Sequence, residues 1–164
     1  MEVLILRDPR EPPAKCSLTP LRGLAGVRFV SYHPERRLDA GERVLLHPDG
    51  EELGPAERGR DLLLIDCAWR RLPSLLARVD GVLHRRRLPL FVSAYPRRSK
   101  THVDPERGLA SVEALYAATL VLGHPRPEFL RAYHWRAAFL EVNRERIERL
   151  LPRGTSPVGP PMPY

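Results

Sequence analysis

The residues with the clearest chemical potential follow a short apolar run near the middle of the chain. Residues 62–65 are four consecutive aliphatic residues, a pattern that predicts a strand buried on both faces of a parallel sheet. The run ends in Asp66, Cys67, Ala68 and Trp69. Ligands bind at the carboxyl ends of such strands, where a buried carboxylate needs a partner and an indole offers a flat apolar surface. The octapeptide indicates either a ligand site at Asp66 or an Asp that caps the next helix above a core Trp69.

Other common catalytic patterns are missing from the sequence. The glycines do not form a phosphate-binding loop after a strand, and neither a nucleophile elbow nor an H-E-x-x-H motif occurs. The six His residues stand singly, and two cysteines without His partners cannot build a zinc cluster. We therefore predict that no metal is bound, that Cys16 and Cys67 are inert buried thiols, and that the His residues lie on the surface or in loops.

The elements that position Asp66 follow from hydrophobic periodicity. Apolar runs predict strands, and apolar residues spaced three and four apart predict helices, which together favour an α/β fold with a largely parallel sheet. The long charged segment 97–109 and the proline-rich tail from residue 152 are predicted loops. The predicted strands cover residues 1–6, 27–32, 44–46, 62–65 and 88–95, and the predicted helices run to about His84, over 112–122 and over 127–151.

The charge of the chain favours a polyanionic partner. The formal net charge is +7, and all but two of the 27 basic residues are Arg. Nucleic acid is the first expectation, although an Arg-rich composition also arises from a GC-rich genome, and any single Arg is as often a solvated surface charge. No apolar run reaches membrane-spanning length and no signal peptide is evident, so we expect a soluble, cytoplasmic monomer. The predicted RNA contacts are Arg22, Arg85, Arg86, Arg87, Arg97, Arg98 and Lys100.

Six segments, in order over residues 1 to 150, resemble the 18S rRNA aminocarboxypropyltransferase family, which is related to SPOUT-type knotted RNA methyltransferases. Its hallmark Asp-Cys-Ser-Trp is matched by residues 66–69. The other similar segments are Cys16-Ser17 with 23–25, Leu46-His47-Pro48 with 53–56, Arg87-Leu88-Pro89 leading to 93–96, Leu109 to Ala114, and His134 to Asn143. The chain departs from the family pattern at Gly54, Ala68, Tyr95 and Arg136, and residues 97–108 replace an Asn-Tyr-Gly loop.

The resemblance implies a SPOUT-like knotted fold with a largely parallel sheet in its C-terminal part. Residues 1–60 would form a small N-terminal α/β region that contributes to cofactor and RNA binding. Residues 61–151 would form the S-adenosylmethionine-binding region, and 152–164 a proline-rich tail. The implied reaction transfers the 3-amino-3-carboxypropyl (acp) group of S-adenosylmethionine to a uridine or pseudouridine base of RNA, most simply small-subunit rRNA, and releases methylthioadenosine.

The resemblance also implies roles for individual residues. Asp66 would act as the base toward the nitrogen of the target nucleobase, or would complement the sulfonium charge. Leu46, Pro48 and Trp69 would shield the methyl group, and Ser17 would bind the ribose. Main-chain groups near Ile65, Leu88, Leu90, Leu109 and Ser111 would contact the adenine.

Other functions remain compatible with the sequence. One is a SPOUT-type RNA methyltransferase, and another is acp transfer to tRNA, although the N-terminal cysteine cluster of those enzymes is absent here. The third is a basic ribosome-assembly protein that kept the fold and lost the transfer reaction, a hypothesis supported by Ala68 and Tyr95.

Overall fold

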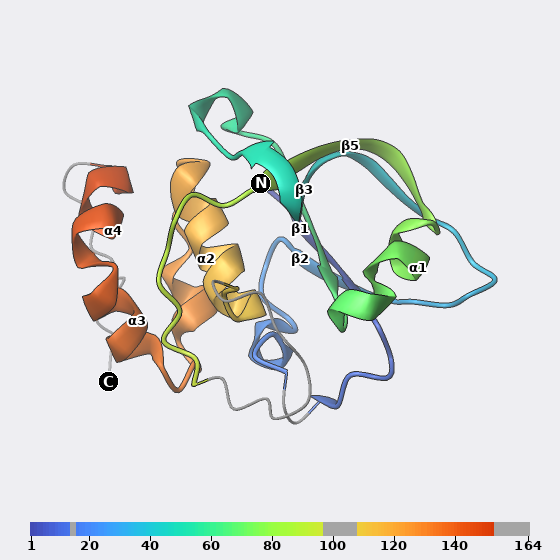
Figure 1. Cartoon of the computed structure of the whole chain (residues 1–164), viewed down its shortest axis with the longest axis horizontal. Coiled ribbons are helices and arrows are strands. Elements are labelled where there is room, and N and C mark those ends of the chain that lie inside the picture. Colours follow the sequence, from blue (N-terminus) through green and yellow to red (C-terminus); the bar gives the residue numbers. More distant parts are fainter. Residues whose placement is uncertain (14–15, 97–107, 153–164) are drawn as a thin grey trace.

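The computed structural model describes residues 1–13, 16–96 and 108–152. Within these ranges, five strands form one sheet in the order β2-β1-β4-β3-β5, and all neighbours are parallel. Figure 1 shows the sheet between helices on both sides. The predicted α/β class with a parallel sheet is confirmed. The strands are β1 (Val3–Arg7), β2 (Val27–Ser31), β3 (Leu38–Glu52), β4 (Leu62–Asp66) and β5 (Val79–Arg87).

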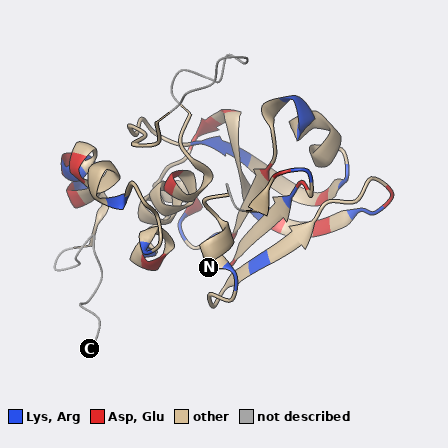
Figure 2. Ribbon diagram, turned by 90° about the horizontal axis from the view of Figure 1, so that it is seen from below, with Lys and Arg blue, Asp and Glu red and all other residues tan. Residues whose placement is uncertain are grey.

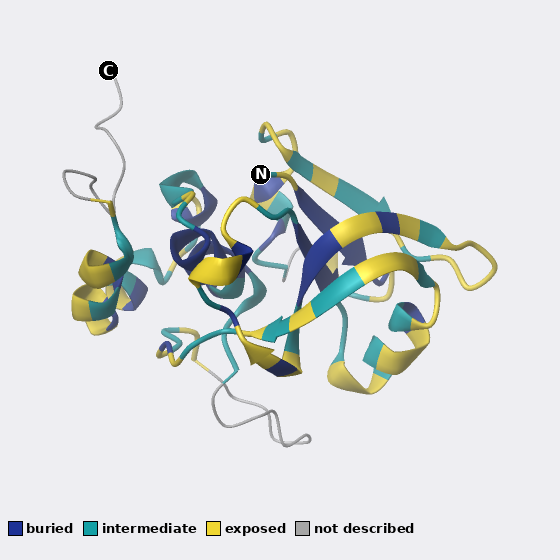
Figure 3. Cartoon of the chain, turned by 90° about the horizontal axis from the view of Figure 1, so that it is seen from above, coloured by how far each residue is buried: buried dark blue, intermediate teal, exposed yellow. Residues whose placement is uncertain are grey.

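Helices cover the two faces of the sheet unequally. The long apolar helix α2 (Ser111–Val121) packs on one face, with α3 (Arg136–Val142) and α4 (Arg144–Leu150) outside it, whereas the short α1 (Leu72–Leu76) lies on the other face (Figure 1). Because side chains alternate along a strand, Ile5 and Leu62 enter the core with α2 while Leu4 and Leu63 enter the core with α1. Figure 3 shows this buried centre and the exposed outer surfaces of β5 and α4.

Short 3-10 helices fill several of the connections. They are η2 (Thr19–Leu21), η3 (Pro55–Glu57), η4 (Trp69–Arg71) and η5 (Pro127–Leu130). Each of η2, η3 and η5 has a proline in its first positions, where the missing N–H costs no hydrogen bond.

The prediction of a helix that continues to about His84 is wrong beyond Leu76. Helix α1 ends there, and residues 79–87 form the edge strand β5, paired with β3. Val79, Val82 and Leu83 fit both a helical spacing and a half-buried edge strand, so periodicity alone could not separate the two. Gly81 decides the geometry, because its φ is +125° and an added Cβ would lie 2.2 Å from the carbonyl oxygen of Gly41 on β3.

The strand predicted at residues 88–95 is also wrong. This segment is not part of the sheet and carries no regular secondary structure. The predicted helix over 127–151 divides into η5, α3 and α4, because Asn143, with φ −109°, separates α3 from α4. Conversely, β3 is far longer than the predicted strand at 44–46. The predictions of β1, β2, β4 and α2 are confirmed to within a few residues.

Three strands of the sheet precede residue 60, so the N-terminal part contributes more of the sheet than expected. The boundary at residue 60 and the knotted threading stay predictions. The tail beyond Pro152 lies outside the described residues. Where the chain is described, no helix combines the length and apolarity needed to cross a membrane.

Candidate active site at the carboxyl edge of the sheet

The carboxyl ends of β1 and β4 lie side by side. Arg7 is paired in register with Asp66, and the amide of Asp8 donates to the Asp66 carbonyl oxygen at 3.0 Å. In open parallel sheets this edge is the usual ligand-binding position. Asp66 therefore lies where a site residue is expected, at the end of a strand whose other residues are buried.

Three chain segments converge on the Asp66 carboxylate. Cys16 Sγ donates to Oδ2 at 3.2 Å, and Ser111 Oγ donates to Oδ1 at 3.1 Å. The Nε of Arg7 lies 3.9 Å from Oδ2, and the side chain of Asp66 is only 13% exposed. An ionised carboxylate has about four lone-pair positions, so these donors leave acceptor capacity for a further proton or cation.

Ser17 and Ser111 act at the start of α2. Ala110 occupies the N-cap position and has no capping side chain; instead, the amide of Val112 donates to Ser17 Oγ at 3.3 Å. Ser111 is the first helical residue rather than the N-cap that its residue type suggests, and its hydroxyl faces Asp66. Ser17, Asp66 and Ser111, which were predicted as site residues from distant parts of the sequence, are thus brought together.

A second set of charges supports the loop after β4. Glu11 Oε1 accepts from the amide of Ala68 at 3.1 Å, and Arg71 Nε donates to Asp8 Oδ2 at 2.8 Å. Burial alone would raise the pKa of Asp8, but hydrogen bonds from Arg71 and the Arg10 amide, with the charges of both arginines, hold it below its ordinary value. The Arg71 guanidinium also lies over the ring of Tyr32, 5.6 Å from its centroid. The 66–71 turn is therefore fixed from the β1 side.

Both thiols are half-buried and keep their protons. Burial, followed by the charge of Asp66, raises the pKa of Cys16. Burial, followed by the charges of Asp8, Asp66 and Glu11, raises the pKa of Cys67 to about 12. Because the thiolate is the reactive form, neither cysteine is poised as a nucleophile. The inert thiols predicted from the sequence fit this chemistry, but Cys16 also contacts Asp66, which was not foreseen.

The apolar residues predicted to line the cofactor site are arranged unevenly. Leu46, Leu88 and Leu109 are partly buried and pack on the same core as α2. Trp69 is 46% exposed, which excludes the alternative of a core Trp beneath a capping Asp. Leu46 and Pro48 follow Leu45, the last residue of β3 that pairs with β4, where it is opposite Leu63, so they lie toward the carboxyl end of β4 that carries Asp66. The side chain of Ile65 enters the core on the α1 face, and Leu90 is 56% exposed.

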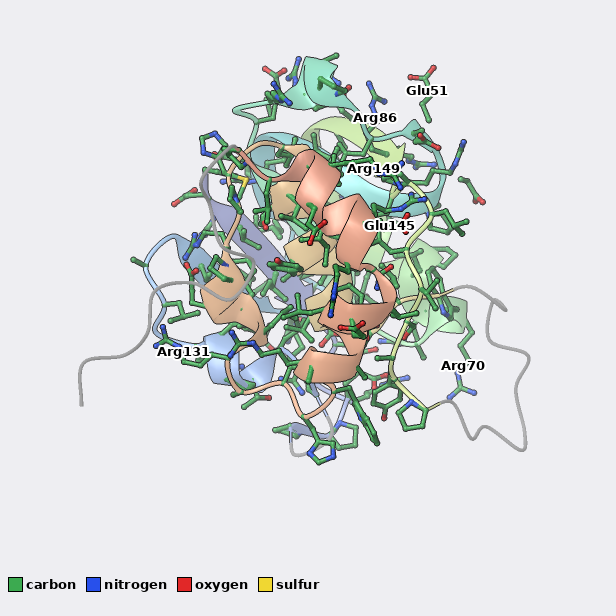
Figure 4. The ribbon with its side chains drawn as sticks, turned by 90° about the vertical axis from the view of Figure 1, so that its left-hand side faces the viewer. Glu51, Arg70, Arg86, Arg131, Glu145 and Arg149 are labelled. Carbon is green, nitrogen blue, oxygen red and sulfur yellow. The ribbon has the colours of Figure 1, made fainter. Side chains whose placement is uncertain are left out.

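The predicted RNA-binding arginines differ in how they are held. Arg86 is tied to the buried Glu57 and forms a second ion pair with Glu51; both Arg86 and Glu51 are labelled in Figure 4. Arg87 contacts Glu52 at 3.5 Å, while Arg85 is exposed and Arg22 lies over the ring of Phe29. Figure 2 shows basic and acidic residues interspersed over strands and helices. Arg97, Arg98 and Lys100 lie outside the described residues.

The described residues contain no group of three or more His, Cys, Asp or Glu side chains placed to hold a metal ion. A hollow of about 490 Å³ exists on α3 and α4, lined by Arg136, Ala137, Leu140, Glu141, Arg144, Ile147 and Glu148, and none of the predicted site residues lines it. The Asp66 edge, with a shielded carboxylate next to apolar side chains, is better suited to a cationic ligand with an apolar body.

Sequence reasoning missed Arg7 and Glu11 as residues that organise this edge. Arg7 ends a strand of otherwise aliphatic residues, and its charge in so apolar a context was the available signal. Glu11 lies in a proline-rich loop, where neither periodicity nor motif marks a contact with residue 68.

Comparisons with known proteins identify the family of the chain. Residues 41–155 match the family described as ribosome biogenesis protein, C-terminal. The 16S rRNA aminocarboxypropyltransferase of Vulcanisaeta distributa is 31% identical over 94% of this chain and 84% of its own length. That of Halobacterium salinarum is 31% identical over 91% of this chain and 86% of its own length.

A solved structure described as the SAM-dependent rRNA:acp-transferase Tsr3 from Vulcanisaeta distributa superposes with a TM-score of 0.69 at 30% identity. The superposition covers 91% of this chain and 82% of that one. The family that the motif order predicts is therefore confirmed. The chain belongs to the family of rRNA aminocarboxypropyltransferases.

Proposed function

We propose that this protein transfers the acp group of S-adenosylmethionine to a uridine or pseudouridine base of small-subunit rRNA. The observation that carries the proposal is the Asp66 carboxylate, which is shielded at the carboxyl end of β4 and contacted by Cys16 and Ser111. Family membership supports the reaction, and the shielded carboxylate supports this edge of the sheet as the place where it occurs.

The donor set at this edge fits S-adenosylmethionine. A carboxylate complements a sulfonium cation, and the partly buried Leu46, Leu88 and Leu109 offer apolar contact for the uncharged parts of the molecule. Trp69, nearly half exposed next to the strand end, is available to cover the methyl group. Ser17 has a hydroxyl proton left to donate to the ribose, because its oxygen accepts from Val112.

When bound, S-adenosylmethionine supplies an acp carbon that is activated by the positively charged sulfur next to it. A nitrogen of the nucleobase forms a bond to this carbon. The carbon–sulfur bond breaks, and its electron pair leaves with methylthioadenosine. Asp66 accepts the proton that the nucleobase nitrogen loses. The protein otherwise contributes by holding the two reactants in line and excluding water, a contribution that is large for reactions between two bound molecules.

Exposed arginines would contact the RNA. Among the described residues, Arg85 and Arg22 are the strongest candidates of those predicted, since Arg86 is committed to Glu57 and Glu51. The contact would be salt-dependent, because each neutralised phosphate releases counterions. We also propose that the protein acts as a cytoplasmic monomer, which size-exclusion chromatography with light scattering and cell fractionation would test.

The test is the variant Asp66→Ala, assayed by mass spectrometry of nucleosides from the rRNA substrate. Turnover is expected to fall by about tenfold or more, since the proton acceptor is lost, while the affinity for S-adenosylmethionine changes less. Asp80→Ala is the matched control, because Asp80 pairs with Arg37 in an exposed position on β5.

Two outcomes would contradict parts of the proposal. Unchanged turnover in Asp66→Ala would exclude Asp66 as the base. A nucleoside whose mass increases by that of a methyl group, rather than by that of the larger acp group, would identify the wild-type protein as a methyltransferase.

A further inference from the structure

The segment 88–96 has no regular secondary structure and no neighbouring strand, and its backbone is hydrogen-bonded by side chains instead. The amide of Val92 donates to Asn143 Oδ1 at 2.8 Å, and Asn143 Nδ2 donates to the Val92 carbonyl at 2.8 Å. Two residues later, the amide of Ala94 donates to Glu113 Oε1 at 2.9 Å. A partly buried backbone requires such partners, and here helices provide what a strand would otherwise supply.

Glu113 is fully buried and accepts four hydrogen bonds. Oε1 accepts from the Ala94 amide and from the Tyr133 hydroxyl at 3.0 Å. Oε2 accepts from Ser93 Oγ at 2.6 Å and from the amide of Ala110 at 2.9 Å. Four donors, together with its position in the first turn of α2, compensate the burial of the carboxylate charge. Burial and the charge of Glu113 raise the pKa of Tyr133, so this hydroxyl remains a donor.

The same carboxylate connects two segments that border the Asp66 edge. One is 88–94, in which Leu88 packs beside the core of α2. The other is 109–111, in which Leu109 packs on that core and Ser111 donates to Asp66. Because Ala94 and Ala110 bond to opposite oxygens of one buried group, neither segment can shift without breaking a bond to Glu113.

We propose that Glu113, assisted by Asn143, is a positioning residue that sets the spacing of the two segments that bind S-adenosylmethionine. The proposal rests on the proposed function for the identity of the ligand. Glu113 does not touch the reacting atoms, and it acts through the segments it holds. Loss of its bonds therefore weakens cofactor binding more than it slows the transfer from bound cofactor.

Glu113→Gln isolates this role because the two side chains have nearly the same shape. If the amide nitrogen replaces Oε2, Ser93 can turn its hydroxyl to accept, but the Ala110 amide cannot. If it replaces Oε1, Tyr133 can accept, but the Ala94 amide cannot. In either orientation one backbone amide loses its acceptor and one segment is released.

The experiment measures the dissociation constant of S-adenosylmethionine by isothermal titration calorimetry for wild type, Glu113→Gln, Asn143→Asp and Tyr133→Phe, together with their thermal midpoints. We expect Glu113→Gln to raise the dissociation constant by about 10- to 100-fold, the factor for one lost hydrogen bond to a charged group. Asn143→Asp keeps the oxygen that accepts from the Val92 amide but loses the side-chain N–H groups, one of which donates to the Val92 carbonyl. This variant is therefore also expected to raise the dissociation constant. At saturating cofactor, kcat changes less than KM.

Tyr133→Phe is the matched control, because it removes one bond to Glu113 but frees neither segment. Its dissociation constant should stay near that of wild type. An equal loss of affinity in Tyr133→Phe would overturn the proposal, as would a Glu113→Gln variant that melts earlier but binds normally well below its midpoint.

Three further outcomes distinguish a failure of the positioning role from a failure of the proposed function. If Glu113→Gln does not fold, Ser93→Ala is the second variant, because unlike Tyr133→Phe it removes one of the two bonds by which segment 88–94 itself is held to Glu113. Unchanged affinity in that variant would refute the positioning role. The calorimetry needs no RNA, so a wild-type chain that binds S-adenosylmethionine without transferring acp would remove the proposed reaction and leave the positioning role intact. A wild-type chain that binds none would contradict the proposed function itself.

Discussion

Strand β4 and segment 88–96 are both apolar runs that end beside the candidate active site, yet they are held by different means. In β4, Leu62 and Leu63 are completely buried between β1 and β3, with hydrogen-bonded neighbours on both sides. In segment 88–96, Phe91 is buried, but Leu90 and Val92 are at least half exposed. One run is part of the sheet, and the other is attached to the helices that cover it.

The difference shows that β4, on one side of the site, is held by a continuous ladder of hydrogen bonds. The backbone of segment 88–96, on the other side, is hydrogen-bonded by very few groups. The position of Asp66 is fixed by hydrogen bonds along the whole of β4, so no single side chain sets it. The segment 88–96 is anchored by the buried Phe91, and its backbone is hydrogen-bonded through Asn143 and Glu113. Elements with few buried contacts open locally at lower free energy, and binding segments are often of this kind.

The largest expected difference between the two runs is in stability. Leu63→Ala should lower the free energy of unfolding by about 2–5 kcal/mol, because it leaves a cavity in the fully buried centre of the sheet. Leu90→Ala, at a position that is 56% exposed, should change it by less than about 0.5 kcal/mol. Urea unfolding monitored by circular dichroism measures both. Equal losses would remove the distinction between the runs.

Hydrogen exchange should separate the two runs by a smaller margin. The amides of β4 are expected to exchange only through extensive unfolding, while those of Val92 and Ala94 exchange at least about tenfold faster through local opening. In Glu113→Gln the exchange of Ala94 should accelerate further, with β4 unaffected. Native-state exchange measured by NMR gives both rates. Protection of Ala94 equal to that of Leu63 would show that two side chains hold a segment as firmly as a sheet.

The smallest effect concerns the carboxylate at the end of β4. Burial and the charge of Asp66 raise the pKa of Cys16, so Asp66→Asn should lower that pKa and increase the thiolate fraction at pH 8. Alkylation of Cys16 by iodoacetamide should then be several-fold faster, as followed by peptide mass spectrometry. Asp80→Asn, far along β5, serves as the control and should leave the rate unchanged. A Cys16 rate that does not respond to Asp66→Asn would argue against a charged Asp66 in contact with this thiol.

The same comparison explains which parts of the fold were predictable from the sequence. The runs at 62–65 and 112–122 are almost entirely apolar because nearly all of their residues are buried, and both predictions are confirmed. Residues 88–95 have the same composition, but a segment's composition does not specify its hydrogen-bond partner. The partner of Val92 is Asn143, fifty-one residues away. Helix α3 also ends at Asn143, and this is where the long predicted helix divides.

The candidate site was predictable only where residue type and strand position coincided. Asp66 and Trp69 stand out because they end a buried strand. The family motifs implied Ser17 and Ser111 but not the contacts they make. The only local signal at Arg7 and Glu113 is a charge within an apolar strand or helix, and such a charge is recognisable as functional only when its partners in other segments are known.

The bond between the Val112 amide and Ser17 has a consequence for the synthesis of the protein. It joins positions 95 residues apart, and the bonds of Asp66 to Cys16 and Ser111 span 50 and 45 residues. During translation the N-terminal strands emerge first, but these contacts cannot close until the start of α2 has left the ribosome. A partly made chain would therefore lack the complete site, and S-adenosylmethionine would stabilise only the finished fold by mass action.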